Sequence, residues 1–261
     1  MDDTNPTQHK HVPTLILSRR DVARLMTPRD HLGAAEEAFR ALATGRASVP
    51  APLHISCNRG AFHAKGARLD VGDGSYAAVK VNGNYPGNPK ANGLPTIQGA
   101  LILSDGENGV PLAIMDSIEI TLRRTAAATA LAATHLARPK ADTVAICGCG
   151  GQAAAQLAAL AGEFSLARVF AWDIDTAAAL SFARASSERF GLAVEAVRSM
   201  REATKASDII VTCTTARAPF LDVADVSPGA FVAAVGADAP AKSEIAPALM
   251  ARARVVVDVL D

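Results

Sequence analysis

The chain has 261 residues with 26 basic and 26 acidic side chains, so its formal net charge is zero, and 49% of its residues are hydrophobic. This length suffices for one large or two ordinary domains, and the balanced charge removes any electrostatic case for binding nucleic acid or an anionic membrane. The sequence has no apolar run of about 18 residues that would span a membrane, its polar start MDDTNPTQHKHVP is unlike a signal peptide, and its four cysteines lack the spacing of a metal site. Together these features predict a cytoplasmic protein with reduced thiols and no bound metal.

The first 115 residues predict an α+β domain. The segment ARLMTPRDHLGAAEEAFRALATGRA favours two helical pieces. It precedes the alternating segments PLHISC, GAFHAKGARL, SYAAVKVNG, TIQGALILSD and GVPLAIMDS, which are separated by glycine-rich turn signals. The expected sheet is mixed or antiparallel, and we place this domain at residues 1–116.

The remainder, residues 117–261, predicts a second domain with a doubly wound parallel sheet. It opens with a long helix over 117–137, whose small apolar residues indicate burial. From Thr143 onward, apolar strand segments alternate with helical segments, as in α/β folds. The predicted strands are 143–147, 168–172, 192–196, 208–213, 230–235 and 253–259.

The stretch DTVAICGCGGQAAAQLAAL joins the first of these strands to a helix. Gly148 and Gly150 lie at the turn, and Ala153 occupies a position where any small residue permits helix–strand packing. Backbone N–H groups at such a turn and at the helix N-terminus hold a pyrophosphate, and Asp173, after the next strand, is placed to accept the ribose hydroxyls. These features predict a Rossmann dinucleotide site. The alternative is a turn whose glycines serve tight packing only.

The acid at the second strand end also predicts which dinucleotide binds. The negative charge of Asp173 would repel a 2′-phosphate, and no arginine follows it in AWDIDTAAA. The sequence therefore predicts NAD in preference to NADP.

Five motifs, in order, resemble the ornithine cyclodeaminase/mu-crystallin family: VKVNGNYPGNP, GLPTIQG, LRRTAAATALAATHLARP, CGCGGQA and VGADAPAKSEI. The resemblance covers nearly the whole chain. It implies a homodimer with a mixed-sheet domain for substrate binding and dimerisation, a Rossmann domain, a nicotinamide cofactor and a small amino- or imino-acid substrate. It also implies a segment beyond VVVDVLD that returns to the first domain and that this sequence does not contain.

The resemblance implies a substrate site made of three residues. Lys80 matches the lysine that holds the substrate carboxylate and acts in proton transfer, Arg124 matches the arginine on that carboxylate, and Asp238 matches the general acid/base. The residues themselves leave alternatives: Lys80 as a solvated strand lysine, and Asp238 as a cap of the helix near Glu244. A guanidinium pairs bidentately with a carboxylate, and Asp238 follows the fifth strand, where open α/β sheets bind ligands.

Cofactor contacts are predicted in both domains. Thr96 matches a family position close to the nicotinamide, and Thr125 matches a position that contacts phosphate. The predicted cofactor-binding residues are Thr96, Arg124, Thr125, Gly148, Gly150, Gly151, Gln152, Ala153, Asp173, Thr214, Val235, Gly236 and Lys242.

Two departures from the family pattern bear on the substrate. Pro52 stands at the position of a second arginine, and His63 stands where cyclodeaminases carry the glutamate that holds the side-chain amine of ornithine. His63 and Lys65 alternate with Phe62 and Ala64, so they share one strand face. This face is either solvated or part of the substrate pocket. In the pocket, its positive charge would favour a dicarboxylate-sized imino acid over ornithine.

Three functions fit these observations. The first is an NAD(P)H-dependent reductase of a small imino acid, which includes imine or ketimine reductases and amino-acid dehydrogenases, with iminosuccinate to aspartate as one instance. The second is ornithine cyclodeaminase, an ammonia-forming lyase with bound NAD. The third is a mu-crystallin-like protein that binds the cofactor without catalysis. Pro52 and the absent glutamate argue against the second, and the intact Lys80, Arg124 and Asp238 argue against the third.

Overall fold

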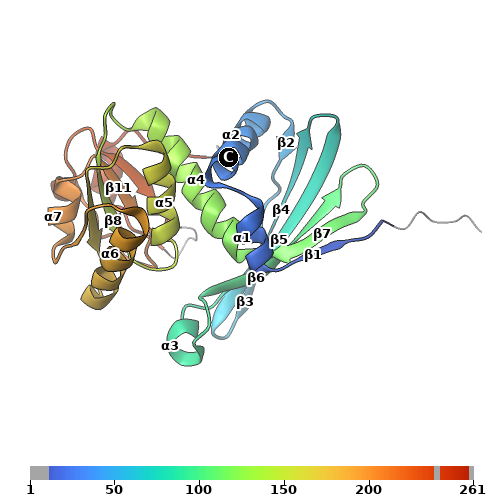
Figure 1. The fold of residues 1–261 in the computed structure, drawn as a ribbon, viewed down its shortest axis with the longest axis horizontal. Helices are drawn as coiled ribbons and strands as arrows, with labels where there is room; N and C mark the ends of the chain where they lie inside the picture. The colour runs from blue at the N-terminus through green and yellow to red at the C-terminus, as the bar shows by residue number, and fades with distance from the viewer. Residues whose placement is uncertain (1–11, 238–241, 259–261) are drawn as a thin grey trace, which may run out of the picture. The chain divides into compact units, whose positions relative to one another are not determined.

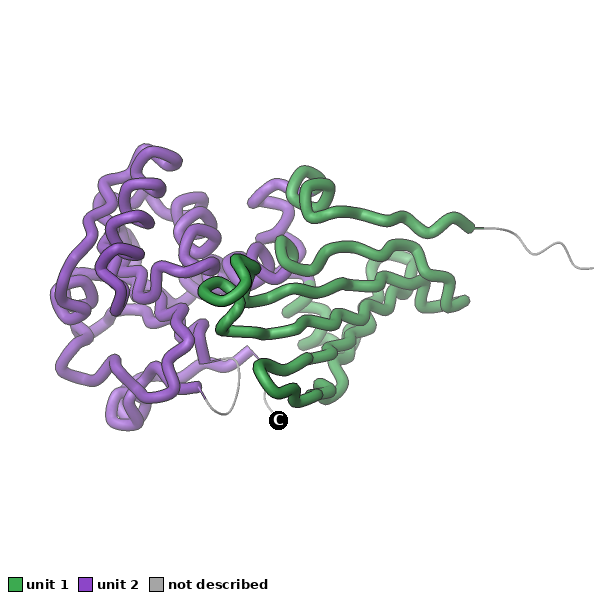
Figure 2. The backbone as a smooth tube through the Cα atoms, turned by 90° about the horizontal axis from the view of Figure 1, so that it is seen from below, with its two compact units in different colours: residues 1–25, 38–120 green, residues 26–37, 121–261 purple. Residues whose placement is uncertain are grey.

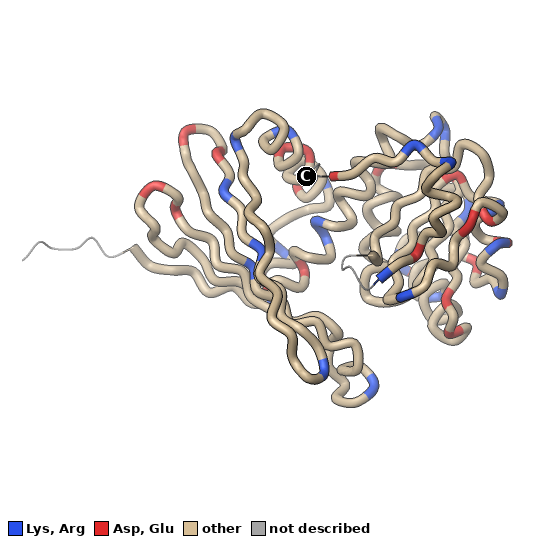
Figure 3. Tube along the Cα trace, turned by 180° about the vertical axis from the view of Figure 1, so that it is seen from behind, with Lys and Arg blue, Asp and Glu red and all other residues tan. Residues whose placement is uncertain are grey.

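The computed structural model describes residues 12–237 and 242–258 (Figure 1). They divide into two compact units (Figure 2): unit 1 holds the described parts of residues 1–25 and 38–120, and unit 2 those of residues 26–37 and 121–261. Two of the three divisions fall within helices, α2 (Pro28–Ala43) and α4 (Ile118–Leu136), and the third follows α1 (Arg19–Leu25). Basic and acidic residues are interspersed along both units (Figure 3), in keeping with the zero net charge.

Unit 1 is built on a mixed sheet of seven strands in the order β1-β7-β6-β5-β4-β2, with β3 also paired to β4. Strand β1 (Leu15–Leu17) runs parallel to β7 (Pro111–Asp116), whereas the other neighbouring pairs are antiparallel. The remaining elements of the unit are β2 (Ala47–Ser48), β3 (Leu53–Cys57), β4 (Gly60–Val71), β5 (Gly74–Asn84), β6 (Ile97–Asp105), α1 (Arg19–Leu25) and α3 (Asn88–Asn92). The predicted α+β architecture with a mixed sheet is confirmed.

The two faces of this sheet differ in chemistry. Strands β4 and β5 pair without interruption from Ala61↔Asn84 to Val71↔Gly74, so alternate residues point to opposite faces along the whole hairpin. One face carries large apolar side chains that are exposed in the single chain: Ile55, Phe62, Val79, Val81, Ile102 and Ile114. We call this the apolar face of the unit 1 sheet.

Unit 2 is built on a parallel sheet of five strands in the order β10-β9-β8-β11-β12. The strands are β8 (Thr143–Cys147), β9 (Arg168–Trp172), β10 (Val194–Ala196), β11 (Ile209–Thr212) and β12 (Phe231–Ala234). The helical elements are α5 (Ala153–Glu163), α6 (Thr176–Phe190), α7 (Met200–Lys205), the 3-10 turn η1 (Val223–Asp225) and α8 (Pro247–Arg252).

Both faces of the unit 2 sheet are buried, because successive strand residues alternate between two apolar clusters. Val144 and Ile146 belong to the cluster covered by α4, α5 and α6, whereas Ala145 and Cys147 belong to the cluster covered by α7. Figure 1 shows the helices on the two sides of the sheet. This two-sided burial of short apolar strands is the physical reason for a doubly wound parallel sheet, and the predicted Rossmann fold is confirmed.

The prediction of a sixth strand at 253–259 is wrong for the residues of this segment that the structure describes. Residues 253–258 form no strand, and β12 ends the sheet on that side. Val255, Val256 and Val257 are 49%, 59% and 52% exposed. β-branched residues favour an extended chain, but a strand also needs a partner for its backbone N–H and C=O groups.

Candidate functional site

The turn between β8 and α5 contains two kinds of glycine. Gly148 has a φ of +98°, and a Cβ there would lie 2.8 Å from Thr214 Cγ2 and 2.9 Å from the Cys213 carbonyl oxygen. The backbone and its packing therefore require glycine at this position. A Cβ on Gly150 or Gly151 would meet no atom within 4 Å. Tight packing does not account for these two glycines, whereas a group bound closely over the turn would.

The start of α5 is tied to α4 within unit 2. Gln152 donates through Nε2 to the carbonyl oxygen of Leu122 at 3.2 Å, and Ala153 is completely buried, as its packing role predicts. Thr125 donates its hydroxyl to the carbonyl oxygen of Thr121 at 2.7 Å. For Thr125 to donate to a phosphate, its hydroxyl would have to turn away from the helix backbone.

Asp173 follows β9 and is hydrogen-bonded to the glycine turn. Its Oδ2 accepts the backbone N–H of Cys149 at 2.7 Å, and its Oδ1 accepts the backbone N–H of Asp175 at 2.9 Å. Asp175 in turn caps α6 by accepting the N–H of Ala177 at 2.9 Å. A carboxylate offers about four lone-pair sites. Asp173 therefore retains acceptor capacity for ribose hydroxyls while two backbone bonds set its orientation.

Three free thiols surround the turn: Cys147, Cys149 and Cys213. Burial, and then the Asp173 carboxylate, raises the pKa of Cys149 to about 12. Burial is also the main cause of the raised pKa of Cys147 and of Cys213. Cys213 donates its thiol to the carbonyl oxygen of Gly148 at 3.0 Å. These neutral thiols serve as small packing groups around the turn.

A residue outside the predicted set, Glu244, is hydrogen-bonded to the carboxyl ends of β11 and β12. Glu244 accepts backbone N–H groups from Thr214 and Gly236, two of the predicted cofactor residues. Val235, which lies between β12 and Gly236, donates its N–H to the carbonyl oxygen of Thr212 at 2.8 Å. The sequence signal that could have found Glu244 is its place in the motif VGADAPAKSEI, two residues after the half-buried Lys242.

In unit 1, the register brings three of the predicted substrate residues to one face. Lys80 on β5 is the direct cross-strand partner of Lys65 on β4, and His63 is the partner of Asn82. Directly opposed residues point to the same face, with Cβ atoms about 4.5–5.5 Å apart. Lys65, Lys80 and His63 therefore share the face opposite the apolar one, and we call their surface the cationic face.

Strand β3 adds His54 to the cationic face. Its Nδ1 lies 3.2 Å from Nδ1 of His63, and the two ring centroids are 4.6 Å apart. Its Nε2 lies 3.1 Å from the hydroxyl of Ser56. Pro52, at the expected arginine position, is exposed and immediately precedes β3. The segment PLHISC does not reveal which residues of β4 it opposes, so the place of His54 could not be predicted from the sequence.

A buried hydrogen bond lies beside the cationic face. Ser117, which immediately precedes α4, donates its hydroxyl to Oδ1 of Asn82 at 2.5 Å. A Cβ on Gly99 would overlap that same oxygen, so the glycine allows β6 to approach. Thr96, just before β6, is half-buried and accepts the N–H of Tyr85 with its carbonyl oxygen at 2.8 Å.

The predicted site residues are distributed over the two units. His63, Lys65, Lys80 and Thr96 belong to unit 1. Unit 2 holds Arg124, Thr125, the glycine turn with Gln152 and Ala153, Asp173, Thr214, Val235, Gly236 and Lys242. Asp238 lies outside the described residues. The convergence of Lys80, Arg124 and Asp238 on one substrate stays a prediction.

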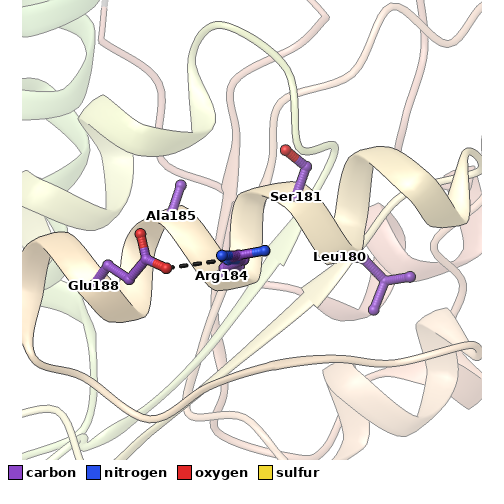
Figure 4. Close-up of a pocket in the computed structure, with 5 residues that line it drawn as sticks. All are labelled: Leu180, Ser181, Arg184, Ala185 and Glu188. Atoms are coloured by element: carbon purple, nitrogen blue, oxygen red, sulfur yellow. Dashed lines mark hydrogen bonds and ion pairs between the residues drawn. The ribbon is translucent and has the colours of Figure 1, made fainter.

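A depression on the outer side of α6 is separate from these residues. It is lined by Leu180, Ser181, Arg184, Ala185 and Glu188 (Figure 4). All five belong to one helix, and Arg184 and Glu188 form an i,i+4 ion pair at 3.1 Å. Ligand sites enclose most of the ligand surface, which a single helix surface does not do, so we assign it no function.

The described residues, 12–237 and 242–258, include no group of three or more His, Cys, Asp and Glu side chains arranged to hold a metal ion. None of their helices combines the length and the apolar character needed to cross a membrane.

Several known proteins are similar to this chain in sequence or in structure. The alanine dehydrogenase of Archaeoglobus fulgidus is 37% identical over 248 residues, which is 95% of this chain and 74% of that protein. The structure of an archaeal alanine dehydrogenase dimer with bound NAD matches with a TM-score of 0.83 and 37% identity, over 89% of this chain and 70% of that one. The iminosuccinate reductase of Paracoccus denitrificans, in complex with NAD⁺, matches with a TM-score of 0.81 and 29% identity, over 93% of this chain and 74% of that one.

The family model of the ornithine cyclodeaminase/mu-crystallin family matches residues 12–261. This range contains both sheets, the glycine turn after β8 and the Lys65–Lys80 pair. The chain therefore belongs to the ornithine cyclodeaminase/mu-crystallin family.

Proposed function

We propose that this chain, an NAD-dependent oxidoreductase of the family, reduces a small imino acid with two carboxylates, such as iminosuccinate, which would yield aspartate. The observation that carries the proposal is the cationic face, where Lys65 lies directly opposite Lys80 and His63 lies beside them. One carboxylate needs no more than Lys80 and Arg124. The additional cationic groups would attract a second carboxylate and disfavour an ammonium group.

The residues present fit a dinucleotide. The open space above Gly150 and Gly151 leaves room for a pyrophosphate, and α5 directs its N-terminus at the same place. The charges of Asp173 and Asp175 favour NAD, because both would repel the 2′-phosphate of NADP. The archaeal alanine dehydrogenase and the Paracoccus reductase were both solved with NAD bound, which supports the same choice.

The proposed reaction assigns each side chain a role. NADH, when bound, supplies the hydride for the imine carbon. Arg124 and Lys80 hold the carboxylate next to that carbon, with the guanidinium fixing its orientation bidentately. Lys65 and His63 hold the second carboxylate. Asp238 donates the proton that the imine nitrogen takes up, which completes the conversion of C=N to CH–NH.

Ornithine cyclodeamination is the alternative within the family. Its substrate carries a side-chain ammonium, which would meet His63 and Lys65 instead of a carboxylate. The positive charge of Lys65 disfavours an ammonium group, and His63 does not provide the carboxylate that would hold one. A mu-crystallin-like protein that binds the cofactor without catalysis is the other alternative, and it would leave the Lys80, Arg124 and Asp238 combination without a use.

We also propose a homodimer formed through the apolar face of the unit 1 sheet. A contiguous exposed apolar surface on one face of a sheet marks an interaction site. The residues of this face come from four neighbouring strands, β3 to β6, and from β7. The archaeal alanine dehydrogenase, which is similar over most of its length, is a dimer.

The function is tested by following NADH absorbance with the whole chain. The substrates are oxaloacetate with ammonia, pyruvate with ammonia, and a cyclic ketimine, and oxaloacetate without ammonia is the control. We expect the fastest NADH consumption with oxaloacetate and ammonia together. Ammonia release from ornithine without net NADH change would favour the cyclodeaminase instead. NADH binding without turnover of any of these substrates would favour the cofactor-binding protein.

A further inference from the structure

Glu244 is a buried carboxylate at the carboxyl ends of two strands of unit 2, and its side chain is only 1% exposed. Oε1 accepts both the backbone N–H and the hydroxyl of Thr214, each at 2.7 Å. Oε2 accepts the hydroxyl of Thr212 at 2.7 Å and the backbone N–H of Gly236 at 2.9 Å. One side chain thus joins the ends of β11 and β12 through four hydrogen bonds.

The backbone of Glu244 is fixed as firmly as its side chain. Its carbonyl oxygen accepts the N–H groups of Phe220 and Leu221, each at 3.0 Å. The next residue, Ile245, forms a parallel β-bridge with Leu221. The preceding residue, Ser243, donates its N–H to the carbonyl oxygen of Ala216 at 3.1 Å. The Glu244 carboxylate therefore reaches the ends of β11 and β12 from a segment, residues 243–245, whose backbone is itself held by hydrogen bonds.

The site requires a carboxylate and not merely a polar side chain of the same shape. Each carboxylate oxygen faces one backbone N–H, that of Thr214 on Oε1 and that of Gly236 on Oε2. A glutamine at 244 would turn its NH₂ group toward one of these N–H donors in either orientation, since an amide has only one acceptor oxygen. A Cβ on Gly236 would overlap Oε1 of Glu244, so the glycine is what permits this approach.

We propose that Glu244 is a positioning residue for the nicotinamide half of the cofactor, acting through Thr214 and Gly236. The inference rests on the proposed function, because it takes these two residues as cofactor contacts. In the strand order β10-β9-β8-β11-β12, the ribose acid Asp173 follows β9 on one side of β8. A dinucleotide that crosses the turn after β8 brings its other half over the ends of β11 and β12. The hydrogen bonds of the Glu244 carboxylate go to Thr212, Thr214 and Gly236, at those two strand ends and away from the adenosine side of the site.

The test compares NADH with ADP-ribose, which lacks the nicotinamide. Kd values for both are measured for the unaltered chain, for Glu244→Gln and for Glu195→Gln. Glu195 is an exposed carboxylate on β10, paired with Arg168 at 3.4 Å, and it serves as the matched control. For Glu244→Gln we expect NADH binding to weaken by about tenfold or more, the effect of one unsatisfied buried donor, with ADP-ribose binding unchanged. Glu195→Gln should bind both as the unaltered chain does.

A second variant keeps the inference testable if Glu244→Gln does not fold. Thr212→Val removes one of the four donors with little change of shape, and Thr212 is completely buried. It should weaken NADH binding by about threefold, because only part of the free energy of the lost hydrogen bond is felt at the cofactor, again without an effect on ADP-ribose. If Glu244→Gln is unfolded by circular dichroism, this variant alone decides.

These outcomes distinguish a failure of the proposed function from a failure of the inference about Glu244. If the unaltered chain does not bind NADH, the proposed function fails and the inference fails with it. If the unaltered chain binds NADH and the variants bind it equally well, only the inference fails. Equal weakening of NADH and ADP-ribose would also overturn it, because a general loss of fold would then be the cause.

Discussion

Asp173 and Cys149 are joined by a hydrogen bond of 2.7 Å, from the backbone N–H of the turn residue to Oδ2 of the acid that follows β9. The bond connects two parts of the dinucleotide site that the sequence predicts separately: the glycine turn for the pyrophosphate and the acid for the ribose. Asp173 thus serves the turn as well as the proposed ribose.

Asp173→Ala is expected to weaken NADH binding by about tenfold or more, because it removes the ribose acceptor and the bond to the turn. NADPH binding should weaken less or improve, because the charge that opposes the 2′-phosphate is also removed. Fluorescence titration with both reduced cofactors measures the change. Glu188→Ala, on the exposed side of α6, is the control for loss of a carboxylate. Unchanged NADH affinity in Asp173→Ala would refute the role of this residue.

Gly148→Ala and Gly150→Ala should separate folding from cofactor binding. At Gly148 the positive φ and the close contacts with Thr214 and Cys213 should lower the free energy of unfolding by about 2–4 kcal/mol. At Gly150 an added methyl group meets no protein atom, so stability should be unchanged while NADH binding weakens. Thermal unfolding and NADH titration of both variants provide the measurement. If Gly150→Ala binds NADH normally, the pyrophosphate does not lie over this turn.

Lys65→Ala should reduce the preference for a dicarboxylic imino acid over the pyruvate-derived one by about tenfold, since a cation paired with the second carboxylate is lost. The register supports this expectation because it places Lys65 directly opposite Lys80. The ratio of kcat/KM for the two substrates is the measurement, and His63→Ala should act in the same direction. Lys205→Ala, an exposed lysine of unit 2, is the control. A preference that survives both substitutions in the cationic face has another origin.

Val81→Glu should convert the proposed homodimer to a monomer, because it places a charge in the middle of the apolar face. Val71→Glu is a closely matched control: the two valines are 42% and 43% exposed, but Val71 lies on the opposite face of the same hairpin. Light scattering coupled to size-exclusion chromatography measures the mass of each variant. Dissociation by Val71→Glu but not by Val81→Glu would assign the interface to the other face.

Alkylation should distinguish the exposed Cys57 from the thiol of the turn. The thiolate is the reactive form, and burial together with Asp173 raises the pKa of Cys149 to about 12. At mildly alkaline pH we expect iodoacetamide to label Cys57 first, with Cys149 labelled only as the pH approaches that value or as the chain unfolds. A raised pKa in the folded state also means that the stabilisation from the neutral Cys149 thiol is complete below the ordinary thiol pKa and is lost as pH rises toward 12. Peptide mass spectrometry identifies the labelled residue.

The local pattern of apolar residues and glycines was sufficient to predict most of the helices and strands. Short apolar runs before glycine or aspartate predicted β8 and β9 with the observed bounds, and α4 at 118–136 differs from the expected 117–137 by one residue at each end. Strands β10, β11 and β12 are shorter than expected, because their outer residues continue past the last ladder pairs. The Val-rich run 253–258 shows the limit: its composition suits a strand, but no neighbouring strand pairs with it.

The family, the fold class, the glycine turn and the acid after β9 could all be predicted from the sequence alone, because each depends on residues that are close in the chain or on motifs in a fixed order. Which side chains meet depends instead on how distant segments pair and pack. His54 joins His63 only through the β3–β4 register, and Glu244 becomes important only where the ends of β11 and β12 converge on it. A single histidine or glutamate has no periodicity of its own. Its partners are chosen by strand pairing and packing between segments that lie far apart along the chain.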